Sequence, residues 1–206
     1  MVDYKSIYKF YEKCFKEHGD TPQGLAWPNE EGMQKRFRVM EGLVDAPHAS
    51  LLDLGCGTGR FLEYLKKNDS KIDYTGMDIS KKFIDHCKKT YITGDFHVRD
   101  ILREPLDPDS YNYIVMNGIL TVKNSLSFPE MWDFTKSLVK GAFLGATHGI
   151  AFNVMSKQVD WERDDLFHLS LDELANFLSS ELSRNFVIRN DYGMYEYTVY
   201  VYKSSR

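Results

Sequence analysis

A chain of 206 residues has the length of one ordinary domain, and its 43% hydrophobic and 14% aromatic content excludes the disordered and fibrous classes. The 26 Lys and Arg residues against 30 Asp and Glu residues give a net charge of −4, so the basic excess typical of nucleic-acid-binding proteins is missing. The three cysteines, Cys14, Cys56 and Cys87, include no CxxC pair, which argues against a disulfide framework and a structural zinc site and favours a cytoplasmic location. No uninterrupted apolar stretch is long enough for a membrane span, so no membrane partner is expected.

The central part of the chain alternates short β-rich runs with amphipathic stretches. We expect buried strands at residues 50–54, 74–79, 96–98, 111–116 and 149–155. Two helices have starts with capping-box spacing, Ser127 with Glu130 and Ser170 with Glu173, a pattern that marks helix N-termini. Continuously apolar strands that alternate with helices are typical of a parallel sheet covered on both faces. The sequence therefore predicts a doubly wound α/β fold.

The N-terminal part differs from this alternation. Aromatic and apolar residues recur near helical spacing in residues 3–17, and a second helix-like stretch reaches about Leu43. A segment with Gly, Pro and Trp, residues 19–28, separates the two. We expect residues 1–48 to form a helical lid over the carboxyl edge of the sheet.

The C-terminal part predicts a β-hairpin. Residues 186–192 are β-rich, Gly193 supplies a turn, and residues 195–202 alternate strictly, as the second strand of an antiparallel pair does. Residues 49–206 would then form the core of a single domain spanning residues 1–206.

A glycine-rich loop follows the first expected strand, where residues 51–60 read LLDLGCGTGR. In open α/β sheets, ligands bind beyond the carboxyl ends of the strands. The G-x-G-x-G spacing is not the G-x-G-x-x-G of dinucleotide-binding folds, and no Lys-Ser/Thr pair follows as in a P-loop. Asp53 comes two residues before Gly55, where a pyrophosphate would be repelled. This loop therefore suits a ligand that carries positive charge at that point.

Two further carboxylates end the next two strands. Asp78 lies nineteen residues after Gly59, the usual place for a carboxylate that accepts both hydroxyls of a ribose. Asp100 ends the third strand, where it can accept a hydrogen bond from an adenine amino group. Ile79 and Ile101 would then lie on the two faces of the adenine ring.

The fourth strand opens at Asn117-Gly118 into a polar loop beside the expected reaction centre. Together, the four ordered motifs in residues 50–120 resemble those of the class I S-adenosylmethionine (SAM)-dependent methyltransferases. The fold of that family is a seven-stranded sheet whose last strand is antiparallel, and the C-terminal hairpin fits it. The resemblance implies a methyltransferase that converts SAM to S-adenosylhomocysteine (SAH). It also implies a methionine site at Asp53, Gly55, Cys56, Gly57 and Gly59, a ribose site at Asp78, an adenine site at Asp100 with Ile79 and Ile101, and a sulfonium site near Asn117 and Gly118.

Each carboxylate also has a purely structural interpretation. Asp53 could cap the loop, Asp78 could belong to the N-terminus of the next helix, and Asp100 could hold a turn. Because all three end consecutive strands at one edge of the sheet, the ligand-binding interpretation is favoured. Cys56, between two glycines, is expected to be a small buried side chain and not a nucleophile.

Two lid residues are further candidates for cofactor binding. Arg36 could pair with the methionine carboxylate in a charge-assisted hydrogen bond, and Trp27 could shield the site. The alternative is that Trp27 belongs to the core and that Arg36 faces water.

The candidate catalytic residues lie in the loop after the fifth strand, residues 156–168. If the methyl acceptor is a hydroxyl group, a base must take its proton, and Asp160 and His168 are the candidates. The alternative is a solvated acidic loop with His168 packed at a helix N-terminus.

The sequence narrows the choice of acceptor. Residues 117–120 lack the Asn/Asp-Pro-Pro-aromatic motif of base-amino methyltransferases, and no basic tract with interleaved aromatics indicates a nucleic-acid channel. A magnesium site would need carboxylates at the ends of the fourth and fifth strands. Asn117 and Asn153 occupy these places, so no metal is expected. The loop at 156–168 carries Asp, Arg and Trp side chains, and the chain is similar to small methyltransferases of glycan and natural-product modification.

We therefore expect a small-molecule or glycan acceptor and O-methylation of a sugar or similar hydroxyl compound. N-methylation of a small amine is one alternative. A cofactor-binding, non-catalytic partner subunit is the other.

Overall fold

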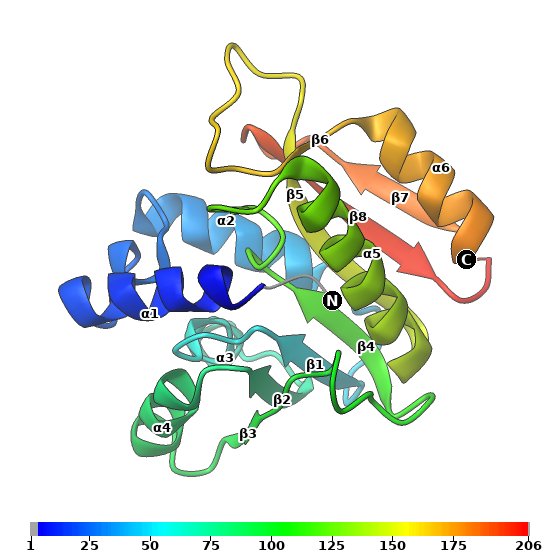
Figure 1. Cartoon of the computed structure of the whole chain (residues 1–206). Coiled ribbons are helices and arrows are strands. Elements are labelled where there is room, and N and C mark those ends of the chain that lie inside the picture. Colours follow the sequence, from blue (N-terminus) through cyan, green and yellow to red (C-terminus); the bar gives the residue numbers. More distant parts are fainter. Residues whose placement is uncertain (1–3, 206) are drawn as a thin grey trace.

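The computed structural model describes residues 4–205, so the first residue of the helix expected at 3–17 lies outside the described residues. The helices are α1 (Lys5–His18), the 3₁₀ helix η1 (Gln23–Leu25), α2 (Glu30–Glu41), α3 (Arg60–Lys67), α4 (Lys81–Thr90), α5 (Phe128–Gly145) and α6 (Leu171–Glu181). The strands are β1 (Ser50–Leu54), β2 (Asp73–Asp78), β3 (Asp95–Val98), β4 (Tyr111–Met116), β5 (Ala146–Ser156), β6 (His168–Leu169), β7 (Phe186–Arg189) and β8 (Glu196–Tyr202). Figure 1 shows helices on both sides of one twisted sheet.

The strands form one sheet in the order β3-β2-β1-β4-β5-β8-β7, and the two-residue strand β6 pairs with β5 beside this path. Neighbours from β3 to β5 are parallel, whereas β8 is antiparallel to both β5 and β7. This arrangement confirms the predicted doubly wound sheet with an antiparallel last strand. β6 was not predicted, because two residues are too short for a periodic signal.

The C-terminal strand β8 is buried along its whole length, although its strict alternation resembles that of a half-exposed strand. The reason is its position between β5 and β7, where helices cover both faces. The tyrosines fit there because their hydroxyl groups find partners: Tyr197 donates to the carbonyl of Leu169 at 3.1 Å, and Tyr200 donates to the carbonyl of Val39.

Two apolar layers cover the sheet. α5 and α6 pack on one face, and α2 and α3 pack on the other, where Met33, Phe37 and Met40 meet Phe61 of α3. The sequence analysis placed α2 in a lid over the carboxyl edge. The structure corrects this, because the apolar stripe of α2 is buried against the sheet face.

The helix starts read from the sequence are largely as predicted. The Ser127–Glu130 capping box is complete, and the Ser170 side chain accepts from the backbone N–H of Glu173 at 3.1 Å. α3 has Gly59 as its N-cap residue, and the neighbouring Thr58 hydroxyl group donates to Asp20 at 2.8 Å.

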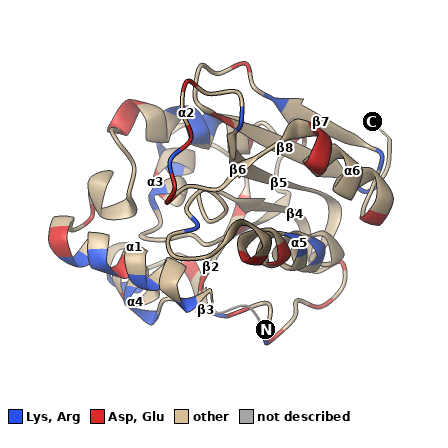
Figure 2. Ribbon diagram, turned by 45° about the horizontal axis from the view of Figure 1, so that its top comes forward, with Lys and Arg blue, Asp and Glu red and all other residues tan. Residues whose placement is uncertain are grey.

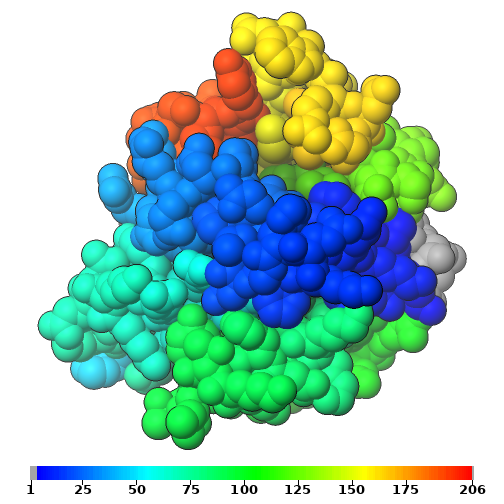
Figure 3. Space-filling view, turned by 90° about the vertical axis from the view of Figure 1, so that its left-hand side faces the viewer, coloured from blue at the N-terminus to red at the C-terminus, as the bar shows by residue number. Residues whose placement is uncertain are grey.

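α1 lies across the carboxyl ends of the central strands. In Figure 3 it crosses the middle of the face shown, between α4 and the loop that follows β5. Basic and acidic residues alternate along the ribbon of α1 in Figure 2. Among residues 4–205, no helix is long and apolar enough to cross a membrane, and no cluster of three His, Cys, Asp or Glu side chains could hold a metal ion.

Candidate active site

A cavity of about 1100 Å³, its open mouth included, lies beneath α1 at the carboxyl ends of β1, β2, β3 and β4. Most of the side chains and glycines that the sequence singled out for the cofactor line it. They are Trp27, Asp53, Gly55, Cys56, Gly57, Asp78, Ile79, Asp100, Ile101, Asn117 and Gly118. We call this space the first cavity. Local chain segments at four strand ends therefore converge on one space.

Asp78 joins the glycine loop to the start of α4. Its Oδ2 accepts from the backbone N–H of Gly57 at 3.0 Å, and its Oδ1 accepts from that of Ser80 at 2.8 Å. Burial raises the pKa of Asp78 to about 6, although these backbone donors favour the charged form. A buried carboxylate with free lone pairs is suited to accept further hydrogen bonds from a ligand.

Asp53 lies beneath the loop and is 2% exposed. Burial raises the pKa of its carboxyl group to about 7, and the hydroxyl group of Tyr74, which donates to it at 2.7 Å, partly opposes that shift. The floor of the first cavity thus holds two carboxyl groups that ionise near neutral pH, and a cationic ligand would favour their charged forms.

α1 is tied to the same strand ends through its polar side chains. The Tyr4 hydroxyl group donates to Asp100 Oδ2 at 2.6 Å, and the Tyr11 hydroxyl group donates to the carbonyl of Gly118 at 2.9 Å. Glu12 accepts from the Ser80 hydroxyl group at 2.6 Å and pairs with Lys82. α1 therefore covers the first cavity and contacts the residues predicted to hold the cofactor.

Two of the predicted cofactor residues lie elsewhere. Gly59 is absent from the lining; it is the N-cap residue of α3 with a φ of +82°, and a Cβ there would come within 2.7 Å of the Tyr91 ring. Glycine is therefore needed at this position for its backbone conformation and for the close approach of the Tyr91 ring. Arg36 is also absent from this lining, and its Nε and Nη2 donate to Glu196 at 2.7–2.9 Å. Arg36 thus pairs with Glu196 in this structure, whereas its predicted partner is a carboxylate of the cofactor.

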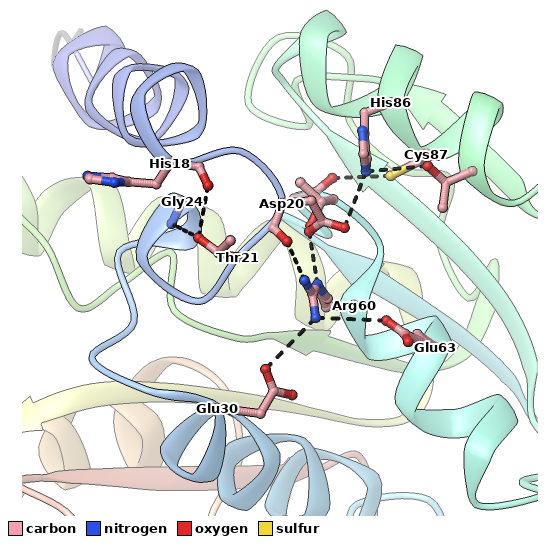
Figure 4. Close-up of polar contacts among 12 residues, drawn as sticks. His18, Asp20, Thr21, Gly24, Glu30, Arg60, Glu63, His86 and Cys87 are labelled. Carbon is pink, nitrogen blue, oxygen red and sulfur yellow. Dashed lines mark hydrogen bonds and ion pairs between the residues drawn. The ribbon is translucent and has the colours of Figure 1, made fainter.

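Two other arginines line the first cavity, Arg99 and Arg60, and Arg60 is the residue directly after the glycine loop. Figure 4 shows it beneath the segment that follows α1, in contact with carboxylates from three parts of the chain. Its Nε donates to Asp20 at 2.9 Å, while Glu30 and Glu63 lie at 3.8 and 4.0 Å. This network ties the loop after α1 to the start of α3.

A second cavity, of about 1150 Å³ with its mouth included, adjoins the first. Tyr11, Leu25 and Trp27 line both cavities. The remaining walls come from the loop after β5, from the β4–α5 connection and from residues 193–196, and they are mostly apolar. A ligand in the second cavity would therefore meet a ligand in the first at these three shared side chains.

The two base candidates both line this second cavity, but they differ in burial and in hydrogen-bond partners. Asp160 is exposed at its rim and accepts from the Tyr195 hydroxyl group at 3.2 Å, beside Trp161, whose side chain is 74% exposed. His168 is buried: its Nδ1 faces the carbonyl oxygen of Ser156 at 2.6 Å, and its Nε2 accepts from the backbone N–H of Arg163 at 3.2 Å. Asp160 has free lone pairs, whereas both ring nitrogens of His168 are occupied.

Sequence reasoning missed several residues of this site. Tyr4, Tyr11 and Arg60 line the first cavity, and Glu196 lines the second. Arg60 had a local signal, because it follows the glycine loop directly. Tyr4 and Tyr11 are part of a helical spacing of apolar residues, and Glu196 belongs to a strand of alternating residues. No local motif therefore indicated that these residues belong to the site.

Comparison with known proteins agrees with this geometry. A family model described as a methyltransferase domain matches residues 51–138. The chain is 28% identical over 158 residues to "Putative methyltransferase Rv1506c" of Mycobacterium tuberculosis, with 76% of this chain and 94% of that protein covered. It is 26% identical over 146 residues to "Putative methyltransferase 235L" of Invertebrate iridescent virus 6, of whose length it spans 54%.

Solved structures share the fold. The 1,6-didemethyltoxoflavin-N1-methyltransferase of Burkholderia thailandensis, solved with its substrate and SAH bound, superposes with a TM-score of 0.66 at 14% identity, covering 98% of this chain and 90% of that one. Residues 51–138 thus match a methyltransferase domain, and the sheet order together with the solved structures shows the fold of the class I SAM-dependent methyltransferases.

The residues present fit the cofactor SAM. Asn117 Oδ1 lies at the first cavity, buried and without a partner among the described residues, so it can accept from an ammonium or hydroxyl group. Asp53 and Asp78 supply acceptors that favour a cation, and the lining between them is largely apolar. A nucleoside joined to a cationic amino acid matches this combination of an acidic floor and apolar walls.

Proposed function

We propose that this methyltransferase transfers the methyl group of SAM to a small acceptor with a hydroxyl group, a sugar or a similar compound, bound in the second cavity. The observation that carries the proposal is the pair of adjoining cavities that share Tyr11, Leu25 and Trp27. Methyl transfer is an in-line displacement that needs the two ligands to meet in one orientation with water excluded. Two cavities that meet at three large side chains satisfy that requirement.

In this proposal the residues of the first cavity hold SAM, which supplies an activated methyl group on a sulfonium. Asp78 accepts from the ribose hydroxyl groups, and Asp100 accepts from the adenine amino group after Tyr4 releases it. Ile79 and Ile101 lie against the adenine ring. The methionine portion lies against the glycine loop, with Gly55, Cys56 and Gly57 as its floor, and Asn117 accepts from the ammonium group.

The acceptor would enter at the rim formed by Asp160, Trp161 and Tyr195. A carboxylate beside exposed aromatic rings can hold a polyhydroxyl compound, since the carboxylate accepts from hydroxyl groups and the rings cover the apolar face of a sugar. The inner wall of the second cavity is mostly apolar, which suits the carbon skeleton of such a compound.

Asp160 is the preferred base for a hydroxyl acceptor in this proposal, because its lone pairs are free. His168 can act as the base only if the backbone N–H of Arg163 releases its Nε2. The two candidates therefore differ in whether the loop at 156–168 must move before proton transfer.

N-methylation of a small amine is the second candidate function. The B. thailandensis relative by fold is an N1-methyltransferase, and an amine needs no strong base because it attacks in its neutral form. A partner subunit that binds SAM without catalysis is a third, which would bind the cofactor and methylate no acceptor alone.

The test is incubation of the purified protein with methyl-labelled SAM and a panel of sugars, phenols and small amines, followed by identification of the labelled product. For a hydroxyl acceptor, we expect Asp160→Ala to lower kcat at least a hundredfold with the SAH dissociation constant unchanged. His168→Ala is measured beside it, and Asp164→Ala, an exposed neighbour in the same loop, is the matched control. Labelled amines alone would support N-methylation, and no labelled product with any acceptor class would support the partner subunit.

A further inference from the structure

A closed circuit of contacts surrounds the junction of the two cavities. It begins at the turn after β4, where the backbone N–H of Gly118 donates to Asn153 Oδ1 at 2.7 Å. The Asn153 amide then donates to Glu196 Oε1 at 3.0 Å. Glu196 receives the two-pronged contact from Arg36 at 2.7–2.9 Å. Four segments distant in the sequence, α2, the β4 turn, β5 and β8, are joined in this way.

The circuit is completed by the indole of Trp27. The guanidinium carbon of Arg36 lies 4.1 Å from the centre of the Trp27 ring, within the range of a cation–π contact. The six-membered ring of the indole also packs on Gly118: with a φ of +89°, this glycine would place a Cβ 2.5 Å from Trp27 Cζ2. The indole is thus held between a guanidinium group and a backbone turn that any larger residue would push away.

The three polar side chains of the circuit are all deeply buried, with Arg36 6%, Asn153 0% and Glu196 1% exposed. A buried ion pair is weak as a source of stability, because the desolvation cost offsets the attraction. Arg36 Nη1 is in addition buried without a partner among the described residues, a further unfavourable contribution. A packing role alone would be met better by apolar side chains, so the pair calls for another explanation.

The position of the indole supplies that explanation. Trp27 lines both cavities, and Gly118 lines the first of them at the end expected to face the sulfonium. Any shift of the indole would change the passage between the cofactor and the acceptor. Trp27 follows η1 in a loop, where its backbone N–H donates to the carbonyl of Pro22 at 2.7 Å, and its ring packs against one of the two core layers. The guanidinium group of Arg36 is the charged group that lies over its ring.

We propose that the Arg36–Glu196 pair positions the Trp27 ring at the junction of the two cavities and so fixes the passage across which the methyl group moves. Arg36 is a positioning residue in this inference, which rests on the proposed function for the meaning of the junction. The inference replaces the sequence-based expectation that Arg36 binds a carboxylate of the cofactor.

The experiment follows Trp27 by fluorescence. The chain has three tryptophans, so the background Trp132→Phe with Trp161→Phe leaves Trp27 as the only one. In that background, the double variant Arg36→Met/Glu196→Gln removes the pair without leaving an isolated buried charge. Acrylamide quenching of Trp27 and calorimetric binding of SAH are measured, with thermal unfolding as the check on the fold.

The matched control is Lys140→Met/Glu181→Gln in the same background, which removes the ion pair between α5 and α6. For the Arg36/Glu196 variant we expect quenching of Trp27 to rise at least threefold, and the SAH dissociation constant to rise about tenfold, because a loose indole no longer forms a fixed wall of the first cavity. The control should change neither. Arg36→Lys keeps a cation over the ring. Its acrylamide quenching and its SAH dissociation constant should therefore lie between those of the Arg36/Glu196 variant and those of the background protein.

Unchanged quenching in a folded Arg36/Glu196 variant would overturn the inference, because the pair would then be structural only. If that double variant does not fold, Glu196→Gln alone, which keeps the size and the contact with Asn153, serves for the same comparison and must also raise the quenching. Failure of the unaltered protein to bind SAH would count against the proposed function instead, while the quenching result would still decide whether the pair positions Trp27.

Discussion

Replacement of Asp78 by Asn tests the ribose site most sharply. The carboxylate already accepts one backbone N–H on each oxygen, from Gly57 at 3.0 Å and Ser80 at 2.8 Å. The Asn side chain has one acceptor oxygen, and its NH₂ group would face one of the two backbone N–H donors. The glycine loop and the ribose would then compete for a single oxygen. Hydrogen bonds to a charged group contribute about 1.5–3 kcal/mol each. The loss of one or two corresponds to about 3 kcal/mol, or about a hundredfold weaker binding of SAH.

The assay is isothermal titration calorimetry with SAH, together with thermal unfolding to show that the variant is folded. Asp85→Asn is the matched control, because Asp85 lies on α4, the helix that follows Asp78, but is exposed and pairs with Lys81 of the same helix. A folded Asp78→Asn protein that binds SAH within threefold of the unaltered chain would refute the assignment of Asp78 to the ribose.

Further predictions concern pH, the lid and the junction. Burial raises the pKa values of Asp53 and Asp78 to about 7 and about 6, from an ordinary value of 3.8. The folded, ligand-free protein therefore binds more protons than the unfolded chain between about pH 4 and pH 7, so its unfolding free energy should fall as the pH rises through that window. SAM is a cation and favours the ionised carboxylates, so its affinity by calorimetry should rise from about pH 5.5 to about pH 8, and a flat profile would contradict the assignment. Tyr4→Phe frees Asp100 Oδ2 from its hydrogen bond, so SAH should bind about threefold to tenfold more tightly in the same assay; weaker binding would show that the tyrosine supports the site. Gly118→Ala places a methyl group 2.5 Å from the neighbouring indole at a φ of +89°, and should lower the melting temperature and weaken SAH binding at least tenfold; a variant with unchanged affinity would mean that the turn adapts freely.

The part of the site that the sequence predicts is the part carried by local motifs. Each of the glycine loop, Asp78, Asp100 and Asn117 follows a recognisable strand. Because the carboxyl ends of neighbouring parallel strands meet at one edge, order in the chain was enough to bring them together. The alternation of strands and helices likewise predicted a doubly wound, mostly parallel sheet, although it gave no strand order.

The part that the sequence did not predict depends on contacts between distant segments. Tyr4 and Asp100 are 96 residues apart, and Arg36 and Glu196 are 160 residues apart. A periodic helix and an alternating strand give the elements of such pairs but not their partners, so Arg36 was assigned to the cofactor instead of to Glu196. The burial of α2 against the sheet face has the same origin, because its apolar stripe fits both a lid and a core helix.

The most direct measurement of the central claim is calorimetric titration of the purified protein with SAM and with SAH. The arrangement of Asp53, Asp78, Asp100 and Asn117 around the first cavity predicts one binding site for each compound, and an advantage for SAM over SAH that grows as the pH rises from about 5.5 to about 8. Absence of binding by both compounds, with the protein shown to be folded, would contradict the assignment of this cavity to the methyl donor.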